Sequence, residues 1–189
     1  MTNDAPKADT AVDKIGASPS LDQRQAPKPA GECGDFEMRI AADGTWYYRG
    51  SPIGRMALVK LFASILKRDE AGDYWLETPV ERGRIQVDDA PFTAIELSVS
   101  GSGEEQRLSF RSNLDEWVDA GPDRPLRVDI AAGSEEPRPY ILIRDQLEAL
   151  ILRPVFYQLA ELAVPRRRAG RETLGVWSNG RFFPLGPSF

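Results

Sequence analysis

The stretch that decides how this chain is organised is residues 74–92, YWLETPVERGRIQVDDAPF, because the two halves of the sequence meet in it. Residues 74–78 are rich in aromatic and other strand-compatible side chains, and residues 84–87 alternate polar with apolar side chains, so both are predicted to be short strands. Pro79 lacks an amide donor and Gly83 adopts a positive φ at no steric cost, so we expect the bend between the strands at these two residues.

The same stretch resembles a known family. Its segment TPVERGRIQVDDAPF is similar to the signature segment of the uncharacterised bacterial family DUF1285. Further similar segments are FRSNLDEWVDAGPDRPLR (110–127), RPYILIRDQLEALILRPVFYQLAE (138–161) and GVWSNGRFFPLG (175–186), and the resemblance runs from residue 36 to the C-terminus. It implies two structurally repeated domains, the second superficially like a pleckstrin-homology fold. It also implies a ligand site at the domain interface and a role in signal transduction.

Composition narrows the class of protein. The chain has 189 residues, of which 41% are hydrophobic, so it can bury an ordinary core. No apolar run reaches the roughly 18 residues of a membrane span, and the polar start MTNDAPKADT lacks the features of a secretory signal. We therefore predict a cytoplasmic protein without a membrane partner.

Two absences limit the chemistry. The sequence has no histidine, which removes the most common proton-transfer residue and every Ser-His or Cys-His nucleophile. Its one cysteine, Cys33, excludes an internal disulfide and a thiolate metal cluster. We expect a protein that is not an enzyme, with no catalytic residues, cofactor or metal. The net charge of −5 argues against a nucleic-acid partner.

The chain divides into a tail and two α+β domains. Residues 1–35 carry few large apolar side chains and are predicted to be a disordered tail. Residues 36–87 form the expected N-terminal domain, and residues 88–189 form the expected larger, pleckstrin-homology-like domain. Gly50 and the pair Asn179-Gly180 are predicted hairpin turns.

Two helices are expected, one in each domain. Apolar residues at helical spacing predict the first from residue 54 to 68 and the second from residue 144 to 163, with a kink at Pro154. SPIGRMALVKLF (51–62) can be laid over YILIRDQLEALI (140–151) with Arg55 on Arg144. Each helix is also preceded by a strand and followed by an aromatic hairpin. The pattern therefore predicts two repeated strand–helix–hairpin domains that pack together with a cleft between them.

Candidate site residues come from both halves. The carboxylates of Glu77, Glu81, Asp88 and Asp89 can hold a hard cation, although ion pairs with arginines or exposure to water is the favoured interpretation. Arg144 and Arg153 lie near the expected junction, where a guanidinium can bind phosphate or carboxylate. The alternative is that they form buried ion pairs, for instance with Glu77 or Asp88, that hold the halves together.

The function predicted from these features is a non-enzymatic, sensory ligand-binding protein. Its ligand is expected to be small, anionic and nucleotide-like, bound at the domain interface. The predicted ligand-binding residues are Trp75, Glu77, Thr78, Glu81, Asp88, Asp89, Arg144, Arg153 and Tyr157. Two alternatives remain: a carboxylate- or metal-dependent enzyme acting on a phosphorylated small molecule, and a module that binds a peptide or protein partner as an added edge strand.

Overall fold

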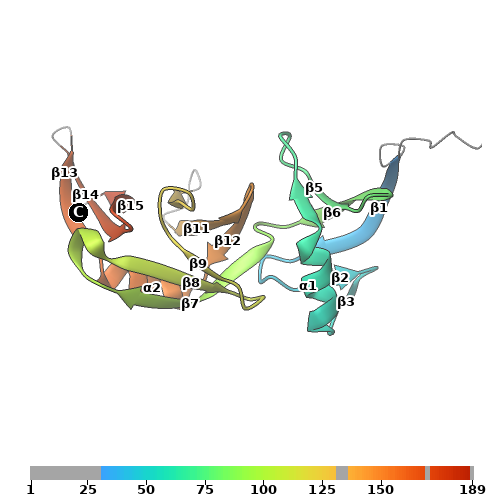
Figure 1. Ribbon diagram of the computed structural model, residues 1–189, viewed down its shortest axis with the longest axis horizontal. Helices are drawn as coiled ribbons and strands as arrows, with labels where there is room; N and C mark the ends of the chain where they lie inside the picture. Colours follow the sequence, from blue (N-terminus) through green and yellow to red (C-terminus); the bar gives the residue numbers. More distant parts are fainter. Residues whose placement is uncertain (1–30, 131–135, 169–170, 188–189) are drawn as a thin grey trace, which may run out of the picture.

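The computed structural model describes residues 31–130, 136–168 and 171–187. Figure 1 shows two bodies side by side along the longest axis, one built from β1–β6 with α1 and the other from the later elements. Strands dominate both bodies, with two short α-helices. The predicted α+β class is therefore correct only in that both element types occur, because the protein is mainly β.

The first body is one six-stranded sheet with a helix against it. Its elements are β1 (Gly31–Ile40), β2 (Trp46–Tyr48), β3 (Ser51–Pro52), α1 (Met56–Ser64), β4 (Leu66–Arg68), β5 (Tyr74–Glu77) and β6 (Glu81–Val87). The strand order is β3-β2-β1-β6-β5-β4, and only β1 and β6 pair in parallel. The first strand begins inside the predicted tail, so that prediction was wrong for residues 31–35. The rest of the predicted tail lies outside the described residues.

The second body contains a six-stranded and a three-stranded sheet. Its elements are β7 (Phe92–Ser100), the 3₁₀ turn η1 (Gly103–Glu105), β8 (Arg107–Ser112), β9 (Trp117–Asp119), β10 (Leu126–Ile130), β11 (Pro137–Arg144), β12 (Leu147–Ile151), α2 (Arg153–Glu161), β13 (Val164–Arg168), β14 (Arg171–Ser178) and β15 (Arg181–Pro187). The larger sheet has the order β10-β11-β12-β7-β8-β9, and β13–β15 form an antiparallel meander. A pleckstrin-homology-like fold for this body stays a prediction.

The two six-stranded sheets repeat one arrangement. Placing β1–β6 on β7–β12 reproduces the strand order and the direction of every pair, including the parallel pairs β1–β6 and β7–β12. Each helix is also followed by three consecutive antiparallel strands, β4–β6 after α1 and β13–β15 after α2. The predicted order of strand, helix and hairpin is present in both bodies. The alignment of residues 51–62 with residues 140–151 was wrong, because the second helix begins only at Arg153.

The second helix is half the predicted length. Residues 140–151 form most of β11, a turn and β12, so Arg144 ends a strand instead of starting a helix. Leu147, Ala149 and Ile151 are buried while the residues between them are half-exposed, which is the alternation of a strand. Pro154 lies in the first turn of α2, where its missing amide proton costs nothing, and it produces no kink.

The first helix and the bend after it also differ in detail. Residues 66–68 pair with β5 as a strand, and the buried face of α1 is formed by Val59 and Ala63. Pro79 does lie in the turn between β5 and β6, but Gly83 is a strand residue of β6. A Cβ atom at Gly83 would overlap the ring of Phe36, so this glycine permits close approach of a side chain.

The predicted hairpin turns at Gly50 and Asn179-Gly180 are confirmed. Arg49, Gly50, Asn179 and Gly180 all have positive φ angles, as the tightest two-residue hairpins require. None of the helices formed by the described residues has the length and apolar character needed to cross a bilayer. The cytoplasmic location stays a prediction.

Candidate functional site

One side of the domain junction is closed by arginine and lysine contacts. Arg144 Nη2 donates a hydrogen bond to the Ala63 carbonyl (2.7 Å), and its Nη1 donates to Glu116 (3.1 Å). Lys60 Nζ of α1 lies 2.9 Å from Asp115 of the second body. A pocket of about 300 Å³ opens here, lined by Lys60, Ala63, Ser64, Leu114, Glu116 and Arg144. Because Arg144 has carbonyl and carboxylate partners, its main role is to join the two bodies.

A network around Asp89 forms the other side. The Asp89 side chain is only 10% exposed, and its two oxygens accept hydrogen bonds from Tyr140 Oη (2.7 Å) and Arg138 Nη2 (2.6 Å). Burial, and then the hydrogen bond that the phenol donates to Asp89, raise the pKa of Tyr140 to about 12. Arg127 covers the Tyr140 ring at 4.1 Å, and its Nε and Nη2 each donate at 2.6 Å to Glu148. These contacts hold a neutral phenol among paired charges.

Tyr74 of the first body lies within electrostatic range of this network. Burial raises the pKa of the Tyr74 phenol, and the negative charges of Glu148 and Asp89 add to the effect, while the positive charges of Arg68 and Arg127 oppose it. Glu148, Asp89 and Arg127 belong to the second sheet or the segment leading into it. The junction is thus polar and electrostatically coupled on this side.

A groove begins at Arg138 and runs along the second body. It has a volume of about 690 Å³ and is lined by Glu136, Pro137, Arg138, Pro139, Leu150, Ile151, Leu152, Arg153, Phe156 and Tyr157. Strands β11 and β12 form one wall, and the first turn of α2 forms the other. Arg153 pairs with Glu136, and both side chains are more than half exposed. The groove therefore combines apolar walls, two guanidiniums and a Tyr157 side chain that is 60% exposed.

The predicted site residues do not form one cluster. Arg153 and Tyr157 line the groove, and Asp89 reaches its edge through Arg138. Arg144 lies apart, in the junction pocket. The predicted pairing of either arginine with Glu77 or Asp88 was wrong, because their carboxylate partners are Glu116 and Glu136.

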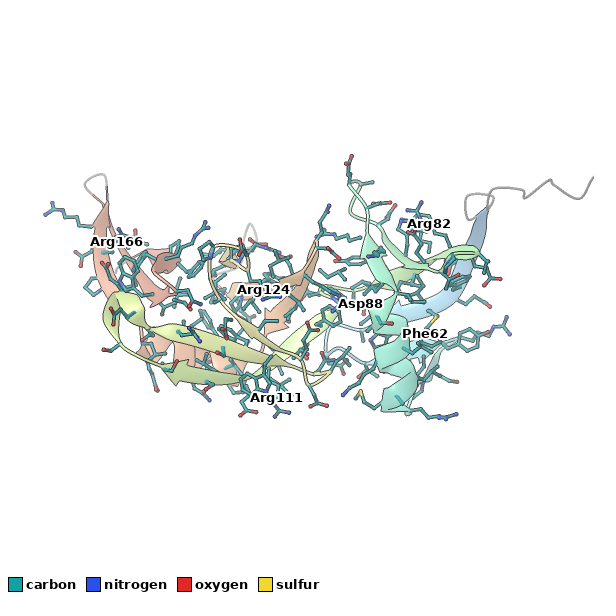
Figure 2. The ribbon with its side chains drawn as sticks, viewed as in Figure 1. Phe62, Arg82, Asp88, Arg111, Arg124 and Arg166 are labelled. Carbon is teal, nitrogen blue, oxygen red and sulfur yellow. The ribbon has the colours of Figure 1, made fainter. Side chains whose placement is uncertain are left out.

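The other predicted residues belong to the first body or its exit. Asp88 accepts hydrogen bonds from Arg39 Nε (2.9 Å) and Nη2 (2.6 Å), and Figure 2 shows it where the two bodies meet. These bonds hold the pKa of the Asp88 carboxyl below its usual range. The remaining four, on the β5–β6 hairpin, are Trp75, Glu77, Thr78 and Glu81.

Contacts within that hairpin account for these four residues. Arg82 stacks on the Trp75 ring at 4.0 Å and lies 4.0 Å from Glu77. Thr78 Oγ1 accepts a hydrogen bond from the Glu81 amide at 3.0 Å, which closes the turn. The four carboxylates of the predicted acidic cluster are therefore dispersed. Over the described part of the chain, no group of three or more cysteine, aspartate or glutamate side chains is placed to hold a metal ion.

Sequence reasoning missed several residues of the site. Arg138, Tyr140 and Arg127 were passed over because their side-chain partners are distant in sequence: Asp89 is 49 and 51 positions from the first two, and Glu148 is 21 positions from the third. A usable signal was present in Arg138 and Tyr140. These residues lie two positions apart on β11 and therefore share a face of the sheet. Asp145, with a positive φ, marks the turn that separates β11 from β12. Recognising that turn would have excluded a helix that starts at Arg144.

Comparisons with known proteins agree with the architecture. Residues 26–90 match the N-terminal domain of unknown function of DUF1285, and residues 91–185 match the C-terminal domain of the protein of unknown function DUF1285. A DUF1285 family protein from Silicibacter pomeroyi DSS-3 is similar at 44% identity with a TM-score of 0.76, over 87% of this chain and 90% of that chain. No curated protein matches.

A second solved structure supports the fold alone. The DUF1285 family protein from Shewanella baltica OS155 shares 24% identity with a TM-score of 0.52, over 66% of this chain and 90% of that one. The two family domains adjoin at Ala90 and Pro91, where β6 leads into β7. The matches to both family domains, and the 44% identity to a solved member, show that the chain belongs to the DUF1285 family.

Proposed function

We propose that this protein is a non-enzymatic, sensory ligand-binding protein that holds a small anionic, nucleotide-like ligand in the groove between β11–β12 and α2. The observation that carries the proposal is the groove itself, in which Arg138 and Arg153 flank apolar walls that include Phe156 and Tyr157. A volume of about 690 Å³ falls within the range of small-molecule sites.

The two kinds of side chain suit the two parts of a nucleotide. A guanidinium offers a planar set of donors that matches two oxygens of a phosphate. The exposed ring of Tyr157 offers a face on which a base can stack. Phosphate at Arg153 and the base along Phe156 and Tyr157 would both contact the α2 wall of the groove.

The ion pairs already present do not prevent this. Arg153 and Glu136 are 66% and 62% exposed, and pairs in such contact with water contribute little free energy. A phosphate can therefore replace Glu136 on Arg153 at small cost. Arg138 differs, because its partner Asp89 is nearly buried and also bonds Tyr140. We expect Arg138 to keep Asp89 and to use its remaining donors for the ligand.

The position of Arg138 supports a role in signal transduction. Its partner Asp89 belongs to the short segment that connects β6 to β7, and thus the first sheet to the second. A ligand that draws on Arg138 would change the charge facing Asp89 and Tyr140. Binding in the groove would in this way change the electrostatic environment of the connection between the two bodies.

Thermal unfolding in the presence of AMP, GMP and inorganic phosphate tests the proposal. We expect AMP or GMP to raise the Tm of the wild-type protein, and Arg153→Ala to abolish the increase. Arg49→Ala is the matched control, since Arg49 is equally exposed and pairs with Glu37 in the first body. A nucleotide-induced rise in Tm that survives Arg153→Ala, or no rise with any of the three probes, would contradict the proposal. Mass spectrometry of co-purified small molecules would extend the set of probes.

A further inference from the structure

The outer face of the first sheet, opposite α1, contains two adjoining hollows. Phe62 of α1 stacks on Trp46 with ring centres 6.3 Å apart, so alternation along β2 places Tyr47 on the outer face. The larger hollow, of about 450 Å³, is lined by β1, β6 and the start of β5. The smaller, of about 340 Å³, is lined by β1, β6, β2 and the turn after β2. Asp35 and Gln86 line both hollows.

Strand β1 bulges at this point. Asp35 pairs with Arg84 of β6 and Arg39 pairs with Gln86, so four positions of β1 run beside two positions of β6. Glu37, inside the bulge, has a φ of 51°, and its amide donates a hydrogen bond of 2.7 Å to the Asp35 carboxylate. A bulge turns side chains away from the regular pattern of a strand, and bulges are frequent beside functional sites. The irregular course of β1 accounts for hollows on a face that regular pairing would leave flat.

Three polar side chains at the larger hollow have unused hydrogen-bonding capacity. Ile85 is buried, so Arg84 and Gln86 on either side of it point outward. Over the described residues, the Arg84 guanidinium donates only through Nη2, to Asp73, and the Gln86 amide has no protein partner. In the same part of the chain, the Asp35 carboxylate accepts only one backbone amide, through Oδ1. A guanidinium, a carboxylate and an amide can therefore all bind a ligand here.

The opposite charges of Arg84 and Asp35 lie side by side without an ion pair between them. The two residues are register partners on neighbouring parallel strands, whose backbones are about 4.8 Å apart. The other charged groups that line the hollows have partners, in the pairs Arg84–Asp73, Arg39–Asp88 and Arg49–Glu37. Among the described residues, Asp35 is thus the one carboxylate of the lining without a cationic partner.

We propose that the larger hollow binds a small zwitterion of the α-amino acid type. The carboxylate of the ligand accepts hydrogen bonds from the remaining donors of Arg84, and its ammonium group donates to Asp35. The Gln86 amide, which both donates and accepts, can bind either group. The side chain of the ligand extends toward the smaller hollow and Tyr47, where the charges are paired, so an uncharged polar side chain fits best. This site is separate from the groove and goes beyond the proposed function.

A ligand with only one sign of charge fits the same hollow less well. An anion at Arg84 would lie beside the carboxylates of Asp35 and Asp73, and a cation at Asp35 would lie beside the guanidinium of Arg84. Like charges brought together lower affinity, whereas matched opposite charges select a partner and fix its orientation. The larger hollow therefore favours a molecule that carries both signs. In the groove, by contrast, the proposed ligand is an anion.

Thermal unfolding of the full chain with each of the common L-amino acids, followed by calorimetric titration, tests this proposal. We expect amino acids with uncharged polar side chains, such as serine or glutamine, to raise the Tm. The one that raises it most is then compared with its N-acetyl derivative, which lacks the ammonium charge, and its α-carboxamide, which lacks the carboxylate. Each derivative should bind the wild-type protein about tenfold more weakly, because it loses a charge-assisted hydrogen bond.

Two variants assign the two charged groups of the ligand. Asp35→Asn keeps the oxygen that accepts the Glu37 amide and removes the charge. It should weaken binding of the free amino acid about tenfold and should not weaken binding of the N-acetyl derivative. Arg84→Gln should weaken binding of the free amino acid by a similar factor and leave that of the carboxamide unchanged. Both side chains are exposed, so both variants should fold with a Tm close to that of the wild type.

Arg107→Gln is the matched control. Arg107 is 58% exposed and lies 3.9 Å from Asp119 in the second body, and Arg84 is 56% exposed in its pair with Asp73. The control should bind the amino acid with wild-type affinity. Arg153→Ala, in the groove, should also leave this affinity unchanged, so the outcome does not depend on nucleotide binding there.

Three results would overturn the proposal. The first is that none of the common amino acids binds the folded wild-type protein. The second is that the N-acetyl derivative and the carboxamide bind the wild-type protein as tightly as the free amino acid, a comparison that needs no variant. The third is that Asp35→Asn and Arg84→Gln lose no more affinity than Arg107→Gln, which would place the amino acid elsewhere on the protein.

Discussion

Arg144 and Ala63 join the two bodies through a hydrogen bond of 2.7 Å between the guanidinium and the backbone carbonyl. Ala63 lies in the last turn of α1, a helix with no basic residue of its own there. Arg144 therefore brings a positive charge from the second body to the negative end of this helix dipole. The same side chain donates to Glu116 and lies over the Phe92 ring at 5.2 Å.

Replacing Arg144 should destabilise the protein moderately. Its side chain is 31% exposed, so neither the full cost of a buried broken pair nor a negligible surface effect is expected. Loss of hydrogen bonds from a charged donor should lower the free energy of unfolding by about 1–2 kcal/mol in Arg144→Ala. Urea unfolding measures this free energy, and the value for Arg144→Lys should lie between those of Arg144→Ala and the wild type. A change in the free energy of unfolding below about 0.5 kcal/mol would show that Arg144 does not stabilise the junction.

Two glycines should not tolerate alanine. A Cβ at Gly83 overlaps the ring of Phe36, and one at Gly175 overlaps the backbone carbonyl of Phe183. Forcing a methyl group into filled space costs about 1–3 kcal/mol, and Gly175→Ala should cost more because a backbone atom cannot rotate away. In thermal unfolding, Gly175→Ala should have a lower Tm than Gly83→Ala. Gly54→Ala is the control, since nothing lies within 4 Å of its Cβ position, and it should match the wild type.

Tyr140 should make the protein sensitive to high pH. Its pKa is raised to about 12 in the folded protein, whereas an unfolded chain has a tyrosine pKa of 10.0. The stabilisation from the neutral phenol is complete below pH 10 and is lost as the pH rises toward 12. Tyrosinate absorbance should show one tyrosine titrating last, and Tyr140→Phe should remove that step. Retention of the step in the variant would assign it to another residue.

Asp88 should make the stability of the protein sensitive to low pH. The hydrogen bonds from Arg39 hold the pKa of its carboxyl below the 3.8 of an unperturbed aspartate. Its contribution is therefore present above pH 3.8 and is lost as the pH falls through the lower, folded value. Asp88→Asn should show a smaller loss of stability between pH 5 and pH 2 than the wild type. Since the Asp88 side chain is 35% exposed, the effect should be small and should shrink with added salt. Identical acid profiles for the two proteins would show that the pair with Arg39 does not stabilise the fold.

Local patterns in the sequence determined much of the secondary structure. The turns at Arg49-Gly50 and Asn179-Gly180 follow from residues that adopt positive φ, which depends on the backbone of two residues alone. Strand alternation in β6 was likewise visible, because this strand buries one face. Such signals survive without tertiary information because their physical cause is local.

Residues 140–151 show where local patterns stop being sufficient. Leu147, Leu150 and Ile151 satisfy a helical spacing, whereas Leu147, Ala149 and Ile151 satisfy a strand spacing. The parallel pairing of β12 with β7 decides between the two. That pairing joins residues more than fifty positions apart, so no window of sequence contains it. The same is true of the site, because Asp89 meets Arg138 and Tyr140 only after β11 has paired with β12 and β10.

The sequence by itself determined the family, the repeated order of elements and the residue types available for chemistry. Only the tertiary structure decided which charges are neutralised. Arg82 and Arg166 both stack on tryptophan, yet one has Asp69 and Glu77 beside it and the other has no carboxylate among the described residues. Electrostatic neutralisation depends on distances between atoms of separate strands, and a linear order of residues does not contain those distances.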